Sequence, residues 1–138
     1  MQSSDPARKE LVLRLLAQNE DVAYASSHLW ERLAIELVGI VGESGFNLLF
    51  ARSIHSCRAE FPWLAVSQPW RQPDSRFTAL EDSLHGKAPD SARLASAALF
   101  LTFTDVLASL IGEPLTIRIL HSAWDEPVPG NAGKEFPQ

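Results

Sequence analysis

Cysteine is nearly absent from this chain of 138 residues, in which Cys57 stands alone. One cysteine cannot form a disulfide within the chain, and the histidines and Cys57 do not show the ligand spacing of a metal site. The first ten residues also lack the apolar core that a secretory signal needs. We therefore expect a cytoplasmic protein with no disulfide, no metal ion and no other cofactor.

Clustered positive charge is lacking as well. Twelve Lys and Arg residues are set against seventeen Asp and Glu, which gives a net charge of −5, and the basic residues are scattered. A surface for binding a phosphate backbone is therefore missing, and nucleic acid is not an expected partner.

One apolar run, residues 94–111, is long enough to cross a bilayer. It contains Asp105, however, and a carboxylate at the centre of a bilayer costs about 2.5–3.5 kcal/mol. The run therefore predicts the central helix of a soluble domain, and a membrane is not an expected partner.

Alternating apolar residues, which would indicate β-strands, are missing at any useful length, whereas apolar residues recur at helical steps of three and four. Apolar residues make up 46% of the chain, enough for one domain with its own core. We predict an all-α fold with a single-domain bundle of about six helices over residues 1–125. Residues 126–138, rich in proline and glycine, predict a disordered tail.

Capping residues divide the chain into these helices. Pro6 should begin the first helix, and Gly42 should end the second. A third helix should follow Ser44 and stop before Pro62. Three further helices are expected within residues 77–86, 89–112 and 113–125. The apolar face expected in the third helix consists of Phe46, Phe50, Ile54, Cys57 and Phe61.

Two parts of the chain resemble each other. Residues 37–43, Leu-Val-Gly-Ile-Val-Gly-Glu, are similar to residues 107–113, Leu-Ala-Ser-Leu-Ile-Gly-Glu. Residues 52–56 and 118–122 then share arginine and histidine in the same order. A duplicated helical hairpin explains this similarity, and so does coincidence, because a helix, a glycine, a glutamate and a second helix are a common way to turn a chain.

Motifs for catalysis are not found. Ser44 lies between two glycines, but a nucleophile elbow needs a glycine two residues after the serine and a strand before it. Ser44 fits a helix cap better. We assign no catalytic residue and predict that the protein is not an enzyme.

His55 is the candidate phosphoacceptor. The segment His55-Ser56-Cys57-Arg58-Ala59 resembles the pattern of histidine phosphotransfer domains, in which the phosphorylated histidine precedes an apolar, a basic and a small residue on a bundle helix. The resemblance covers five residues, and Ala59 stands where those domains usually have glycine. It implies a signalling domain that uses His55, and the alternative is an inert surface histidine.

The four tryptophans fall into two groups. Trp30 and Trp124 occupy positions typical of a helical core. Trp63 and Trp70 lie in a segment rich in proline, so we predict them to bind a partner protein, for which tryptophan is a frequent anchor.

Asp105 is the only charge in its apolar run. It either faces water or forms a buried ion pair, because charged residues are rarely buried without partners. The candidate partners are Arg52 and Arg118, which hold equivalent places in the repeated segments.

These features predict a non-enzymatic cytoplasmic module of bacterial type. It would act through a protein partner, or through self-association, in a regulatory or signalling system. Two alternatives are a phosphotransfer domain using His55 and a binder of a small apolar ligand between the helices.

Overall fold

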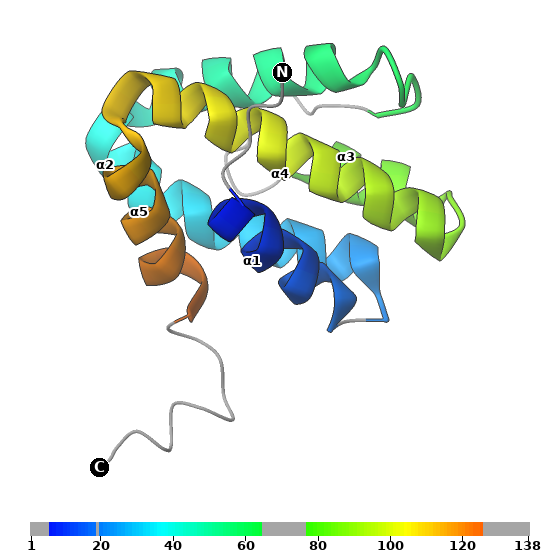
Figure 1. The fold of residues 1–138 in the computed structure, drawn as a ribbon. Helices are drawn as coiled ribbons and strands as arrows, with labels where there is room; N and C mark the ends of the chain where they lie inside the picture. The colour runs from blue at the N-terminus through cyan, green and yellow to red at the C-terminus, as the bar shows by residue number, and fades with distance from the viewer. Residues whose placement is uncertain (1–5, 19, 65–76, 126–138) are drawn as a thin grey trace.

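The computed structural model describes residues 6–18, 20–64 and 77–125, and no strand is formed within these ranges (Figure 1). Five helices are present there: α1 (Pro6–Ala17), α2 (Val22–Cys57), α3 (Thr78–His85), α4 (Pro89–Ile111) and α5 (Glu113–Asp125). The predicted all-α class is therefore confirmed for the described part of the chain. Trp70 and the tail at 126–138 lie outside the described residues.

The helix count differs from the expected six because α2 does not end at Gly42. The backbone leaves the helical region there, with φ 85° and ψ 163°, and the helix resumes directly afterwards. The second and third helices of the prediction thus form one element with a kink. The physical reason is that a single glycine can redirect the chain without additional loop residues.

The end of α2 at Cys57 comes earlier than the predicted stop at Pro62, whereas several other helix ends agree with the cap residues in the sequence. Pro6 and Pro89 are the first residues of α1 and α4, a position at which proline sacrifices no hydrogen bond within the helix. Asp21 caps α2, because its Oδ1 accepts a hydrogen bond of 3.0 Å from the backbone N–H of Tyr24. Gly112, with φ 96° and ψ 150°, ends α4, and α5 begins at Glu113.

The other helices pack around α2, which contacts α3, α4 and α5, whereas α1 lies mainly against α4. In Figure 1, α1 runs alongside α4, and the turn between α4 and α5 lies at the same end of the molecule as the bend of α2. As a result, the beginning of α1 meets the beginning of α5.

Aromatic side chains form the centre of the core. The ring of Trp30 stacks on Phe100, with centroids 4.3 Å apart, and meets Phe50 edge to face at 4.8 Å. Trp124 is also buried, and its Nε1–H donates a hydrogen bond of 3.0 Å to the carbonyl of Leu29. Both tryptophans are therefore core residues, as predicted. Four residues of the face expected around Phe46 are buried, Phe46, Phe50, Ile54 and Cys57, whereas Phe61 lies beyond the end of α2 and is half-buried.

Two helices, α2 and α4, are long and apolar enough to cross a bilayer by length and composition alone. A core helix of a folded domain has the same properties. In α4, the side chains of Leu99, Phe103 and Leu107 are fully buried by neighbouring helices. Much of the apolar surface of α4 is thus covered by the protein itself.

Candidate functional site

A buried arginine joins three helices. Arg8 lies on the apolar face of α1, and only 1% of it is exposed. Its Nε is 2.6 Å from Oε2 of Glu113 and its Nη2 is 3.2 Å from Oε1, so the two side chains form a bidentate pair. Its Nη1 lies 2.9 Å from Oδ1 of Asp105 and donates a hydrogen bond of 2.7 Å to Oγ1 of Thr104. We call these four residues the Arg8 cluster.

The electrostatics of the cluster favour a permanent cation. Burial disfavours the charged guanidinium, but hydrogen bonds and negative charge from Glu113 and Asp105 outweigh this effect, so the pKa of Arg8 is raised above its ordinary value. A guanidinium in this state cannot act as an acid or a base. The cluster is therefore suited to holding α1 against α4 and α5.

The partner of Asp105 is Arg8 and not one of the two arginines proposed from the repeated segments. Arg52 and Arg118 are both exposed, on α2 and α5. The physical reason is that α1 packs along α4 and delivers its own arginine to Asp105. A signal for this was present in the sequence, because Arg8 stands three and four residues before Leu11 and Val12, on the apolar face of α1.

Large aliphatic side chains are exposed on the two longest helices. They include Ile40, two residues before the kink of α2 at Gly42, and Leu110, two residues before Gly112 at the end of α4. Five such side chains are more than half exposed: Ile35 (74%), Ile40 (52%) and Leu48 (62%) on α2, and Leu94 (65%) and Leu110 (64%) on α4. We call these five residues the exposed aliphatic set. Ile40 and Leu110 hold equivalent places in the repeated segments.

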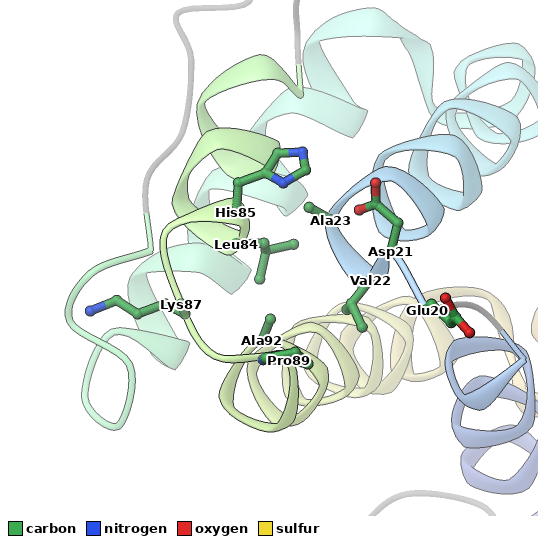
Figure 2. Close-up of a pocket in the computed structure, with 9 residues that line it drawn as sticks. All are labelled: Glu20, Asp21, Val22, Ala23, Leu84, His85, Lys87, Pro89 and Ala92. Carbon is green, nitrogen blue, oxygen red and sulfur yellow. The ribbon is translucent and has the colours of Figure 1, made fainter.

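A pocket of about 240 Å³ lies where the start of α2 faces the end of α3 and the start of α4 (Figure 2). Apolar side chains, among them Leu84 and Ala92, line it together with charged residues. In Figure 2 the carboxylates of Glu20 and Asp21 lie on one side, and the side chain of Lys87 extends away from the cavity. The volume is below the range of about 300–1,000 Å³ that is typical of ligand pockets.

His55 and Cys57 have opposite surroundings on α2. His55 is exposed, whereas Cys57 is buried and donates a hydrogen bond of 3.5 Å from Sγ to Oγ1 of Thr102. Burial, assisted by the charge of Glu60, raises the pKa of the Cys57 thiol against the opposing effect of Thr102. Cys57 thus has the environment of an unreactive core thiol.

Trp63 is half-buried near the end of α2. Its ring meets Phe61 edge to face at 6.0 Å, and Nζ of Lys87 lies 5.2 Å from the ring centroid. Among the described residues, no group of three or more His, Cys, Asp and Glu side chains is placed to hold a metal ion.

Comparison with known proteins yields no relative: no family model, curated protein or solved structure matches this chain.

Proposed function

We propose that this protein is a non-enzymatic helical module that binds another protein, or a second copy of itself, in a regulatory or signalling system of a bacterial cytoplasm. The observation that carries the proposal is the exposed aliphatic set. Large aliphatic side chains that are more than half exposed are candidates for a binding surface, because the free energy falls when a partner covers them and releases the water around them.

Trp63 belongs to the same proposal. A half-buried tryptophan, fixed by packing against Phe61, loses little conformational entropy when a partner covers it. Trp70 remains a proposed second anchor from the sequence.

The bundle arrangement and its origin in a duplicated hairpin are also proposals. The two glycines of the repeated segments support them, because Gly42 and Gly112 both adopt positive φ at a bend between helical segments. A soluble state is supported by Arg8 and Asp105, since this ion pair brings charge to the side of α4, one of the two helices apolar enough to cross a bilayer.

The test uses a photo-crosslinking residue introduced at Ile40 or Leu110 in the host cell, with Ser91 as an exposed polar control on α4. We expect both aliphatic positions to capture the same protein, or a second copy of this chain, and the control to capture neither. Equal products at all three positions would contradict the proposal.

A second candidate, phosphotransfer at His55, has one observation in its favour. His55 is exposed on α2, and Arg52, also exposed, precedes it by three residues on the same helical face. A phosphoacceptor must be accessible, and a neighbouring guanidinium would stabilise the phosphoryl group.

A further inference from the structure

The first helix has the characteristics of a ligand bound in a groove. Its inward face carries apolar residues three, four, seven and eight positions after Arg8: Leu11, Val12, Leu15 and Leu16, all buried. This is the spacing with which an amphipathic helix fills an apolar groove. Its outward face is exposed, at Lys9, Glu10, Leu13 and Arg14.

The surface below α1 carries negative charge at the end where α4 is followed by α5. Asp105 on α4 and Glu113 on α5 provide two carboxylates, and Thr104 accepts a further hydrogen bond. Arg8 is the side chain of α1 that meets them, in its first turn. The two carboxylates therefore fix the orientation of a bound helix, because the cation of that helix must lie at the end that meets them.

The attachment of α1 depends mainly on one neighbouring helix, as that of α3 does on α2. Helix α1 packs mainly on α4, with little contact to α2, and it is joined to α2 by the short segment 18–21. The helices α2, α4 and α5 contact one another independently of α1 and share the aromatic core around Trp30 and Trp124. Local opening of α1 would thus leave the remaining helices in contact.

We propose that the surface below α1 is a binding groove for a helix of a partner protein, and that α1 occupies it as an internal competitor. The partner helix carries arginine in its first turn and apolar residues three, four, seven and eight positions later. The Arg8 cluster includes no residue of the exposed aliphatic set. The groove proposal can therefore fail while the proposed function holds, and the proposed function can fail while the groove proposal holds.

Competition between α1 and the partner helix regulates binding at the groove. A tethered helix has a high effective concentration, so a free helix binds only to the fraction of molecules in which α1 has opened. The Arg8 cluster keeps that fraction small. Weakening the cluster within the chain should therefore strengthen binding of a helix supplied from outside.

The test titrates a labelled peptide of residues 6–18 with the full chain and follows fluorescence anisotropy. We expect the Arg8→Ala chain to bind this peptide at least about tenfold more tightly than the wild type, because α1 no longer competes fully. The Arg14→Ala chain is the matched control, since it loses an exposed arginine on the outward face of α1, and it should bind like the wild type. A peptide with Arg8→Ala should not bind any chain.

Hydrogen exchange of the unmodified chain gives a readout that does not depend on a variant folding. We expect the amides of Leu11 and Leu15 to exchange about a hundredfold faster than those of Leu99 and Phe103 in α4, through an opening confined to α1. Exchange of α1 and α4 at one common rate would overturn the proposal. Equal affinity of the peptide for the Arg8→Ala and Arg14→Ala chains would overturn it too.

Discussion

Gly42 and Gly112 hold nearly the same backbone conformation, with φ 85° and ψ 163° at the first and φ 96° and ψ 150° at the second. Each glycine follows an exposed aliphatic residue two positions earlier, Ile40 or Leu110, and precedes a glutamate. Positive φ at both positions explains why glycine stands there, since residues that carry a Cβ rarely adopt this backbone conformation.

Substitution of either glycine by alanine should destabilise the fold. A Cβ at Gly42 would meet no atom within 4 Å, and one at Gly112 would meet only Cδ of Pro114 at 3.8 Å, so backbone strain is the sole cost. We expect Gly42→Ala and Gly112→Ala each to lower the free energy of unfolding by about 1–3 kcal/mol. Urea unfolding measures this loss.

Gly39 supplies the matched control, because it lies in α2 without positive φ and a Cβ there would meet nothing within 4 Å. Gly39→Ala should stabilise the protein by about 0.5–1 kcal/mol through its higher helix propensity. A loss of stability at Gly39 as large as at Gly42 would refute the role of positive φ.

The Arg8 cluster makes a second prediction. Arg8→Met removes the cation and keeps most of the volume, so Asp105 and Glu113 lose the opposite charge of Arg8. Breaking a buried pair costs about 3–5 kcal/mol, and we expect a loss of about 3 kcal/mol because the carboxylates, 26% and 38% exposed, retain contact with water. Thr104→Val removes the acceptor of the hydrogen bond from Arg8 and the hydroxyl that donates to the carbonyls of Phe100 and Leu101, so it should cost about 1–3 kcal/mol.

A double-mutant cycle identifies the partner of Asp105. Asp105→Asn combined with Arg8→Met should be strongly non-additive, whereas Asp105→Asn with Arg118→Ala should be additive within about 0.5 kcal/mol. Coupling to Arg118 and none to Arg8, measured by urea unfolding, would show that the ion pair described above is wrong.

Cys57 predicts a dependence of stability on pH. Its pKa is raised in the folded state, so its contribution is complete below the pKa of the unfolded thiol, about 8.5, and is lost as the pH rises through the folded pKa. The stability advantage of the wild type over Cys57→Ala should therefore decrease between pH 8 and pH 10. Thermal unfolding at several pH values measures it, and an advantage that grows with pH would contradict the raised pKa.

The two functional candidates differ in their chemistry at His55. If the protein is a binding module, phosphoramidate should label His55 no faster than His28, which is also exposed on α2. Selective, acid-labile labelling that disappears in His55→Ala would instead favour phosphotransfer and displace the leading proposal.

Local features of the sequence predicted most of the elements. Pro6, Pro89 and Gly112 mark helix ends in the structure as they do in the sequence, because caps act on the nearest turn of backbone. Helical periodicity, which defines the apolar face of each helix, predicts Trp30 and Trp124 in the core, and both are buried. Gly42 predicts the end of a helix, but the sequence does not distinguish a kink from two separate helices.

The amino-acid sequence by itself determined the all-α class, several helix ends and most of the apolar faces, since each depends on residues within a few positions of one another. Only the tertiary structure decided that Arg8 meets Asp105 and Glu113, and that Arg52 and Arg118 remain exposed. Helical periodicity predicts which face of a helix is buried. The packing of α1 along α4 decides which charged residues, distant in the sequence, meet at that face.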